Sequence, residues 1–189
     1  MSPIIIGITG FKRSGKDTAA VYLLNCFSYK KFPIVKRLGF ADGVKEEIAE
    51  ALGTTVKVIE DRKNIPEVRR LLQWWGTEFR RADNDLYWID RLANKIAALQ
   101  WKAGPDKRAV IIIADCRFPN EADFIRSNGG YIIKVERPGF DNSNDPHPSE
   151  AFVSSMPAHI YIKNDNKPLK LQKEIEWLFM EHITRHFKL

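Results

Sequence analysis

The feature that most constrains the fold is a glycine-containing turn at residues 10–18, which separates an apolar run from a helical pattern. Residues 4–8 form a short, continuous apolar run rich in isoleucine, and such a run is typical of a strand buried on both faces of a parallel sheet. After the turn, apolar residues recur at helical spacing, at Ala20, Leu23, Leu24 and Phe27. Strand, glycine turn and helix in this order predict an α/β fold with an anion held at the turn.

Within the turn, Gly10 and the Gly15-Lys16 pair have the spacing of a phosphate-binding P-loop. Glycines allow main-chain N–H groups to point at phosphate oxygens, the following helix adds its N-terminal dipole, and Lys16 supplies a charge for the β and γ oxygens. A plain glycine turn with an exposed lysine is the alternative. The predicted ATP-binding residues are Gly10, Lys12, Arg13, Ser14, Gly15, Lys16, Asp17, Thr18 and, from a later turn, Asn164.

The turn departs from the usual P-loop at one position, because Asp17 stands where a Ser or Thr normally follows the lysine. A hydroxyl at that position normally contacts Mg²⁺. Asp17 can hold the metal as an anion, or Thr18 can contact a phosphate instead. We therefore predict a Mg²⁺ site with Asp17, Thr18 and Asp115 as candidate ligands, and the sequence leaves open which of them binds.

The rest of the chain alternates further apolar runs with helical patterns. Because several of the runs are fully apolar, this alternation predicts a parallel sheet with helices on both of its faces. The binding crevice of such a sheet lies at the carboxyl ends of its strands. We expect the remaining strands at residues 34–40, 109–115, 131–137 and 159–163.

Charged residues follow the third expected strand. Asp115 after a buried strand is the Walker-B arrangement, in which a carboxylate holds Mg²⁺ directly or through water. Alternatively, Asp115 caps the helix that begins near Asn120. Arg117 at the rim of the crevice can bridge phosphates, although a surface ion pair with Glu121 is the simpler interpretation.

The segment 69–81 is the other dense stretch of chemistry-bearing residues. Trp74 and Trp75 are adjacent and cannot both face the same core, so one of them is free to stack on a planar ligand such as a base. An amphipathic helix end is the alternative. The polar residues that can bind a base edge, a sugar or a monophosphate are Gln73, Thr77, Glu78, Arg80 and Arg81.

Two local features are expected to mark helix boundaries near this segment. Pro66 suits the first turn of a helix, and Gly76 is a natural stop for it. Asp42 can cap an earlier helix, which follows the strand at residues 34–40.

Residues 137–150 are polar and follow a strand end, so they are either a surface loop or a lid that closes over phosphates. Arg137 at the base of the segment favours the lid, and His147 within it is interpreted as a loop histidine. Residues 162–166 form a turn that can also supply a wall of the adenine pocket.

Composition narrows the function classes. The net charge of +6, from 30 basic and 24 acidic residues, suits an anionic partner, but no basic block is long enough for a nucleic-acid tail. No apolar stretch reaches the length of a membrane span, and the N-terminus lacks the features of a signal peptide. We therefore expect a cytoplasmic protein that binds small-molecule nucleotides, with nucleic acid unsupported and with Cys26 and Cys116 as reduced core thiols.

Six stretches in this order resemble the deoxynucleoside monophosphate kinases of tailed bacteriophages, within the P-loop nucleoside-monophosphate-kinase group: GFKRSGKDT, FADGVK, LLQWWGTEFRR, DCRFPNEADFI, HPSE and IKNDN. The resemblance implies a three-layer α/β/α P-loop kinase with a five-stranded parallel sheet and a short lid. It implies ATP as the donor, Mg²⁺, and a dNMP acceptor bound near Asp42, Lys45 and residues 73–81. Homodimers are also common among such kinases.

These expectations combine into one mechanistic hypothesis for a single domain, residues 1–189, with an acceptor-binding subregion at about 42–90 and a lid at about 137–150. Lys16, Arg117 and Arg137 are the predicted catalytic residues, since they can neutralise charge on the transferring phosphoryl group. Arg81 and Arg117 are expected to hold the acceptor phosphate, and Asp115 lies beside the acceptor. Two alternatives stay open: a kinase for another phosphorylated metabolite, similar to phosphomevalonate kinase, and a DNA-associated ATPase.

Overall fold

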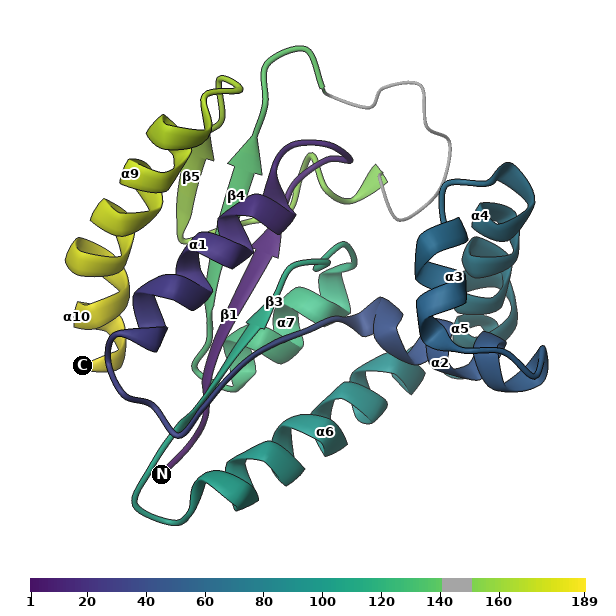
Figure 1. Ribbon diagram of the computed structural model, residues 1–189, viewed down its shortest axis with the longest axis horizontal. Helices are drawn as coiled ribbons and strands as arrows, with labels where there is room; N and C mark the ends of the chain where they lie inside the picture. Colours follow the sequence, from purple (N-terminus) through teal and green to yellow (C-terminus); the bar gives the residue numbers. More distant parts are fainter. Residues whose placement is uncertain (141–150) are drawn as a thin grey trace. The chain divides into compact units, whose positions relative to one another are not determined.

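The computed structural model describes residues 1–140 and 151–189 (Figure 1). The chain divides into unit 1, residues 1–38 and 96–189, and unit 2, residues 39–95. Unit 2 contains the whole subregion, about 42–90, in which the sequence predicts the acceptor site. Most of the expected lid, residues 141–150 with His147, lies outside the described residues.

Unit 1 is built on a five-stranded parallel sheet with the strand order β2-β3-β1-β4-β5 (Figure 1). The strands are β1 (Ile4–Thr9), β2 (Ile34–Leu38), β3 (Ala109–Ile113), β4 (Tyr131–Glu136) and β5 (Ile160–Lys163). β1 and β3 are buried along their whole length, and their register places Ile5 beside Ile111. The predicted parallel sheet is confirmed, and its most apolar strands lie at its centre.

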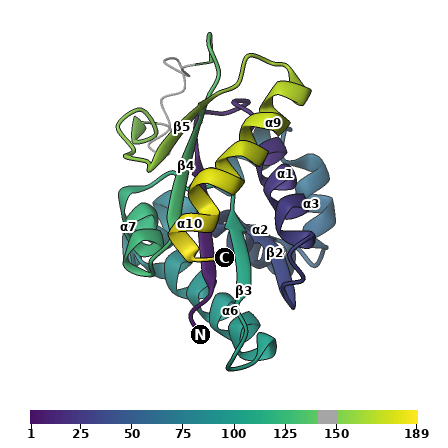
Figure 2. The ribbon, with the colours of Figure 1, turned by 90° about the vertical axis from the view of Figure 1, so that its left-hand side faces the viewer.

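Helices cover both faces of this sheet (Figure 2). α1 (Lys16–Ser28) and α9 (Pro168–Leu178) lie on one face, and α7 (Pro119–Ser127) lies on the other. After α9 the chain continues through the π-helical turn η2 (Phe179–Ile183) into α10 (Thr184–Phe187). This three-layer arrangement confirms the predicted fold class. The core between the sheet and the first face includes the fully buried side chains of Ile4, Ile6, Ile8, Leu23, Phe27, Ile133 and Ile175.

Several strands end earlier than the apolar pattern predicts. β2 ends at Leu38 instead of residue 40, and β3 ends at Ile113 instead of residue 115. Ile113 is the last residue of β3 that pairs on either side, with Leu38 and with Gly7. A strand ends where its neighbours no longer supply hydrogen-bonding groups, and the apolar pattern does not carry this information.

The structure also bears on two further sequence expectations, the state of the cysteines and the presence of membrane-spanning helices. Cys26 and Cys116 are both free, and burial raises the pKa of the Cys116 thiol well above its ordinary value. No helix within residues 1–140 and 151–189 is long and apolar enough to cross a membrane.

Unit 2 is helical and contains α2 (Phe40–Ala51), α3 (Val56–Arg62) and a helix that runs from residue 66 to residue 83. Asp42 does not cap α2, because the helix begins at Phe40 after Gly39 and Asp42 lies within its first turn. Pro66 is the first residue of its helix, as predicted. The long helix consists of α4 (Pro66–Gln73), the π-helical η1 (Trp74–Phe79) and α5 (Arg80–Asp83), and α6 (Tyr87–Ala103) starts soon after it.

The prediction that Gly76 stops a helix is wrong. Gly76 lies in the middle of η1, where it is buried, and the Trp88 indole N–H donates to its carbonyl oxygen at 2.8 Å. A Cβ at this position would lie 3.3 Å from a methyl group of Val44. The glycine therefore serves close packing, and its carbonyl oxygen accepts from a side chain of another helix.

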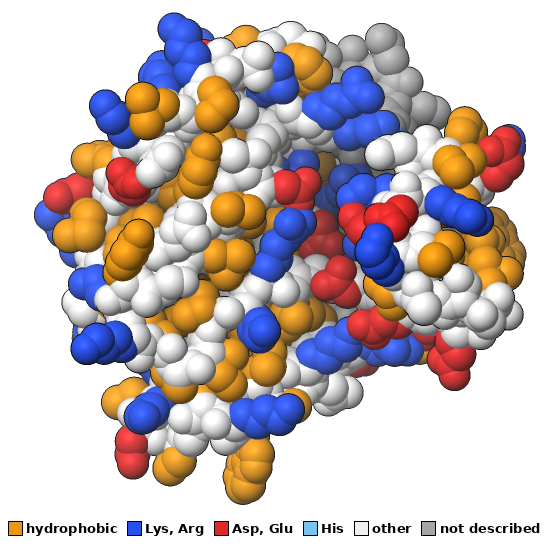
Figure 3. Space-filling view, viewed as in Figure 1, with side chains coloured by type: hydrophobic (Ala, Val, Ile, Leu, Met, Phe, Trp, Pro, Cys, Tyr) orange, Lys and Arg blue, Asp and Glu red, His pale blue; other side chains and the backbone are white. Residues whose placement is uncertain are grey.

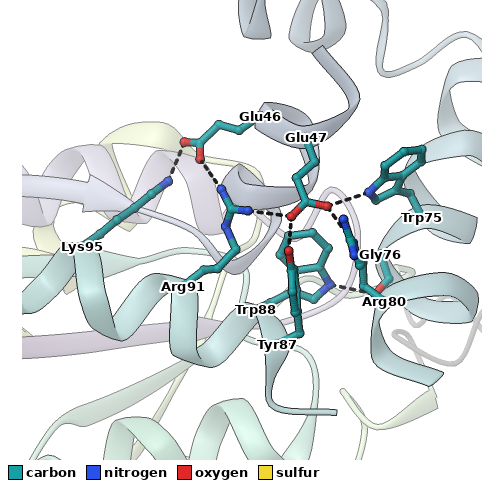
Figure 4. A network of polar contacts seen from close by, with 9 residues as sticks. All are labelled: Glu46, Glu47, Trp75, Gly76, Arg80, Tyr87, Trp88, Arg91 and Lys95. Carbon is teal, nitrogen blue, oxygen red and sulfur yellow. Dashed lines mark hydrogen bonds and ion pairs between the residues drawn. The ribbon is translucent and has the colours of Figure 1, made fainter. Parts of the chain in front are cut away.

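The side chain of Glu47 organises unit 2 (Figure 4). Its carboxylate, which is 8% exposed, accepts from the Trp75 indole at 2.9 Å and from Arg80 Nε at 2.8 Å. It also accepts from Arg91 Nη1 at 2.6 Å and from the Tyr87 hydroxyl. Four donors from two other helical segments thus converge on one buried carboxylate of α2, which satisfies its hydrogen-bonding capacity.

The protonation of Glu47 is set by opposing effects. Burial raises the pKa of the Glu47 carboxyl. The hydrogen bonds from Trp75, Tyr87 and Arg80, together with the charge of Arg80, lower it by more than burial raises it, so the pKa lies below its ordinary value. A carboxyl whose pKa is lower in the folded state stabilises the fold above its unfolded pKa, and this stabilisation is lost as the pH falls through the folded pKa.

Replacing Glu47 by alanine should lower the free energy of unfolding by about 3 kcal/mol at pH 7, because the two arginines lose a largely buried partner. Urea denaturation followed by tryptophan fluorescence measures this change. Glu46→Ala is the matched control, since Glu46 pairs with Arg91 and Lys95 at the surface, and its loss should cost less than about 1 kcal/mol. The stability difference between wild type and Glu47→Gln should shrink below about pH 4.5. Equal losses for Glu46→Ala and Glu47→Ala would contradict this account.

Candidate functional site

The predicted phosphate loop connects β1 to α1 in unit 1, and two glycines shape it. Gly10 and Gly15 have φ values of 145° and 103°, which side chains rarely adopt. A Cβ on Gly10 would lie 2.3 Å from the Val135 carbonyl oxygen, and a Cβ on Gly15 would lie 2.3 Å from the Asn164 amide nitrogen. Both positions therefore require glycine on two independent grounds, backbone conformation and close approach.

Lys16 is the first residue of α1 and is 6% exposed. Its ammonium group donates to the Phe11 carbonyl oxygen at 2.6 Å, across the loop. Gly15 precedes the helix and has no side chain that could cap it, so no N-cap side chain competes with an anion at the N-terminus of α1. The lysine and the helix N-terminus together form a positively polarised cradle of the kind that binds phosphate.

A cavity of about 330 Å³ opens beside this cradle. Six of the predicted ATP-binding residues contribute to its wall, namely Arg13, Gly15, Lys16, Asp17, Thr18 and Asn164, and the predicted catalytic residue Arg137 joins them. Asn166 also lines the cavity, and it belongs to the turn 162–166 expected to supply a wall of the adenine pocket. Pro168 and Leu171 line the cavity as well, and the sequence patterns do not assign them to a site.

Asn164, which the sequence predicts only as an ATP-binding residue, also forms hydrogen bonds that hold the loop. Its side-chain amide nitrogen donates to the Ser14 carbonyl oxygen at 2.8 Å, and its amide oxygen accepts from the Asn166 main-chain N–H at 3.0 Å. The residue directly follows β5 and is 7% exposed. Asn164 therefore braces the phosphate loop from the far side of the cavity in addition to forming part of its wall.

Arg137 lies at the mouth of the cavity. It follows β4, and its Nη1 donates to the Arg13 carbonyl oxygen at 3.2 Å. Its guanidinium group lies 4.1 Å from the centre of the Phe140 ring, which is a cation–π distance. The structure thus brings Arg137 beside the phosphate loop, as a catalytic role requires.

The predicted metal ligands have oxygen atoms that suit Mg²⁺, which prefers carboxylate and hydroxyl oxygens completed by water and substrate phosphates. Asp17 is exposed, and its carboxylate pairs with Arg37 of β2, a partner that the sequence pattern does not reveal. Within residues 1–140 and 151–189 there is no group of three or more His, Cys, Asp or Glu side chains that could hold a metal by themselves. The donor set therefore fits a metal that is shared with phosphate groups, not a closed protein cage.

Two further hydroxyl groups lie under the loop. Thr9 and Ser14 are fully buried, and their hydroxyl oxygens have no hydrogen-bond partner among the described residues. A Cβ on Gly10 would lie 2.7 Å from Ser14 Oγ, so this hydroxyl packs directly against the loop backbone. Unsatisfied buried polar groups are uncommon in folded proteins, and here they coincide with the predicted anion site.

Asp115 and Arg117 lie in the loop between β3 and α7 in unit 1. The alternative interpretation of Asp115 as a helix cap is wrong, because Glu121 performs this function. The Glu121 carboxylate accepts from the main-chain N–H groups of Arg117 at 2.8 Å and Phe118 at 3.1 Å, and α7 begins at Pro119. Glu121 is 2% exposed, so it acts as an internal cap that holds the Arg117 backbone.

The residues predicted to bind the acceptor belong to unit 2, except Asp115 and Arg117. Trp74 is 50% exposed, and one face of its ring stacks on Phe79 with the ring centres 5.4 Å apart. Trp75 instead donates to Glu47. As expected, the two tryptophans do not share one environment: Trp75 is tied into the helix packing, and Trp74 is exposed.

The other predicted acceptor residues differ in how accessible they are. In α2 the Lys45 ammonium group lies 3.4 Å from the Asp42 carboxylate, and it also pairs with the Glu60 carboxylate at 2.9 Å. The Arg81 side chain is only 7% exposed and lies 3.8 Å from the Asp85 carboxylate. Gln73 ends α4, and Thr77 and Glu78 lie in η1, where Glu78 is exposed and the other two are half-buried.

Figure 3 shows how charged side chains are distributed on one face of the protein. In Figure 3 the Lys and Arg side chains are spread over the visible face among apolar and acidic side chains. A nucleic-acid-binding surface normally gathers its cations in a patch or stripe. The visible face therefore offers no support for the DNA-associated alternative.

Comparison with known proteins identifies the family. The profile of the family described as deoxynucleotide monophosphate kinase matches residues 36–175. A putative deoxynucleotide monophosphate kinase of Acanthamoeba polyphaga mimivirus is 32% identical over 182 residues, which cover 88% of this chain and 91% of that protein. The deoxynucleotide monophosphate kinase of Enterobacteria phage T4 is 31% identical over 157 residues, which cover 80% of this chain and 61% of the phage protein.

Solved structures are less similar. The shikimate kinase from Aquifex aeolicus superposes with a TM-score of 0.46 and 16% identity, over 95% of this chain and 98% of that chain. This similarity is too low to add to the assignment, which rests on the family profile and on the two viral relatives. The chain belongs to the deoxynucleotide monophosphate kinase family.

Proposed function

We propose that this protein transfers the γ-phosphoryl group of ATP to a deoxynucleoside monophosphate and releases a deoxynucleoside diphosphate. The observation that carries the proposal is the glycine-shaped loop of residues 10–18, with Lys16 and the open N-terminus of α1 directed at one cavity. Family membership supplies the acceptor class, because both viral relatives are named for deoxynucleotide monophosphates.

The triphosphate of ATP occupies the loop in this proposal. Main-chain N–H groups of residues 13–18 bind the β and γ oxygens, and Lys16 exchanges its Phe11 carbonyl partner for a phosphate oxygen. Mg²⁺ bound to the phosphates would supply charge neutralisation, with Asp17, Thr18 and Asp115 as its candidate protein ligands. Arg37 already pairs with Asp17, so it controls how much negative charge that carboxylate offers.

The acceptor needs little chemical activation. A monophosphate oxygen is already a nucleophile, so the protein contributes by positioning the two nucleotides and by stabilising charge. Residues 73–81 with Asp42 and Lys45 bind the base and sugar, and Arg81 and Arg117 are the cations that the sequence assigns to the acceptor phosphate. Arg137, which donates to the Arg13 carbonyl beside the loop, stabilises the transferring group.

The acceptor class is tested by an ADP-release assay with ATP, Mg²⁺ and each of the four dNMPs, their ribose counterparts and phosphomevalonate. We expect release with at least one dNMP and none with phosphomevalonate. Turnover with phosphomevalonate alone would replace the proposal by the second kinase class. ATP hydrolysis that is stimulated by DNA and falls steeply with salt would instead indicate the DNA-associated ATPase.

Replacing Lys16 by alanine should reduce kcat/KM several hundredfold, which corresponds to about 3–4 kcal/mol of transition-state stabilisation. The reason is that the ammonium group binds the phosphoryl group most strongly as charge develops on it. Steady-state kinetics with the best dNMP measures the effect. Lys30→Ala is the control, because Lys30 is an exposed lysine after the end of α1, and near-normal turnover of Lys16→Ala would contradict the scheme.

Replacing Asn164 by aspartate should weaken ATP binding about tenfold, because a carboxylate cannot donate to the Ser14 carbonyl and repels it. Calorimetric titration with MgATP measures the affinity. Asn25→Asp makes the same chemical change at an exposed position of α1 and should leave the affinity unchanged. An unaltered affinity in Asn164→Asp would mean that the loop holds its shape without this brace.

A further inference from the structure

Arg80 of unit 2 is held in one orientation from three sides. Its Nε donates to the Glu47 carboxylate at 2.8 Å (Figure 4). Its guanidinium carbon lies 5.0 Å from the centre of the Phe79 ring and 4.9 Å from that of the Tyr87 ring. The Arg80 side chain nevertheless remains 34% exposed. An arginine that is fixed in this way has already lost most of its conformational freedom before any ligand arrives.

The terminal amino groups of Arg80 are not used by the interactions that fix it. Only Nε donates a hydrogen bond to Glu47, and among residues 1–140 and 151–189 the two Nη groups form no hydrogen bond. The Nη groups form the part of the guanidinium fork that binds two oxygens of one phosphate group at once. The orienting contact and the available donors therefore lie on different parts of the same side chain.

The charges around Arg80 also favour an anion. Arg80, Arg91 and Lys95 carry three positive charges, and Glu46 and Glu47 carry two negative ones, so this cluster has one surplus positive charge. Arg91 contacts both carboxylates, and Lys95 contacts Glu46. Within the part of the chain that the structure describes, Arg80 pairs with the Glu47 carboxylate alone and shares it with Arg91, so the charge of Arg80 is only partly neutralised.

We propose that Arg80 is the cation that binds the phosphate of the acceptor dNMP and that Glu47 is its positioning residue. This inference rests on the proposed function and deepens it. It changes the assignment that sequence favours, because the neighbouring Arg81 is only 7% exposed and lies against Asp85. Neither the family likeness nor the sequence pattern selects Glu47 or the division of work between the two arginines.

The same geometry predicts which part of the substrate Arg80 recognises. A fixed guanidinium with two donors suits the doubly charged phosphate and makes no distinction among bases. The binding of the deoxynucleoside, which has the base and sugar without the phosphate, should therefore be unaffected by a change at Arg80. This difference separates a phosphate-binding role from a general loss of the acceptor pocket.

The test compares wild type with Arg80→Gln, Arg80→Lys and Glu47→Gln, and uses Arg91→Gln as the matched control. Arg91→Gln also removes an arginine that donates to Glu47, on the other carboxylate oxygen, but it leaves Arg80 in place. Three quantities are measured for each protein. They are the KM for the best dNMP at saturating ATP, the KM for ATP, and the inhibition constant of the corresponding deoxynucleoside. Calorimetric titration with the dNMP alone and urea denaturation complete the set.

We expect Arg80→Gln to raise the KM and the dissociation constant for the dNMP about tenfold to a hundredfold, the effect of losing a charge-assisted, bidentate contact. The KM for ATP and the inhibition constant of the deoxynucleoside should change less than about twofold. Arg80→Lys keeps the charge but loses the planar guanidinium fork and the hydrogen bond from Nε. Its KM for the dNMP should therefore lie between the values for wild type and Arg80→Gln. Glu47→Gln should raise the KM for the dNMP several-fold, whereas Arg91→Gln should lower stability without this rise.

Three results would overturn the inference: an unchanged KM for the dNMP in Arg80→Gln, an equal rise in Arg91→Gln, or a parallel rise in the inhibition constant of the deoxynucleoside. If Arg80→Gln does not fold, Arg80→Lys and Glu47→Gln decide the question by the same measurements. Failure of the proposed function looks different, because wild type itself would then neither turn over nor bind any of the four dNMPs. In that case the inference fails together with the function on which it rests.

Discussion

The loop of residues 10–18, the proposed phosphate site, is tied to the rest of the fold by a tertiary contact, the hydrogen bond from the Asn164 amide to the Ser14 carbonyl, which joins residues 150 positions apart. A loop that turns its N–H groups inward turns carbonyl groups outward, and these need donors of their own. Asn164 supplies such a donor, and it approaches so closely that Gly15 cannot carry a side chain. On the other side, the Val135 carbonyl imposes the same restriction on Gly10. Strand β4 and the turn that follows the edge strand β5 thus hold the loop in shape.

Unit 2 uses a buried charge in a comparable way. The Glu47 carboxylate collects an indole, a phenol and two guanidinium groups, and each of them thereby acquires a fixed direction. Replacing a buried ion pair by apolar groups often costs little stability, so the value of such a pair lies in orientation. Fixed orientation matters for a kinase of this family, because phosphoryl transfer requires alignment of the reactants and charge neutralisation more than acid–base chemistry.

Much of the fold follows from local pattern. The isoleucine-rich runs of β1 and β3 can only be stable inside a sheet covered on both faces, and the glycine and lysine spacing after β1 is enough to indicate the phosphate site. The errors concern helix boundaries, and one of them occurs where a residue serves a distant neighbour. Gly76 resembles a helix stop, but it makes room for Val44 and offers its carbonyl to Trp88. Asp42 resembles a cap, but the helix already begins at Phe40. Glu121 caps the helix that Asp115 could have capped in the alternative interpretation.

The sequence alone therefore determined the class of sheet, and it predicted the place of the phosphate loop and the candidate nucleotide-binding residues, because strand burial and turn geometry are local properties of short segments. Only the tertiary structure decided which of those residues are accessible and oriented. It buries Arg81, exposes Arg80 under the hold of Glu47, pairs Asp17 with Arg37 and turns Asn164 into a brace. The physical reason is that burial and hydrogen-bond partners come from segments far apart in the chain, whose approach no local pattern encodes.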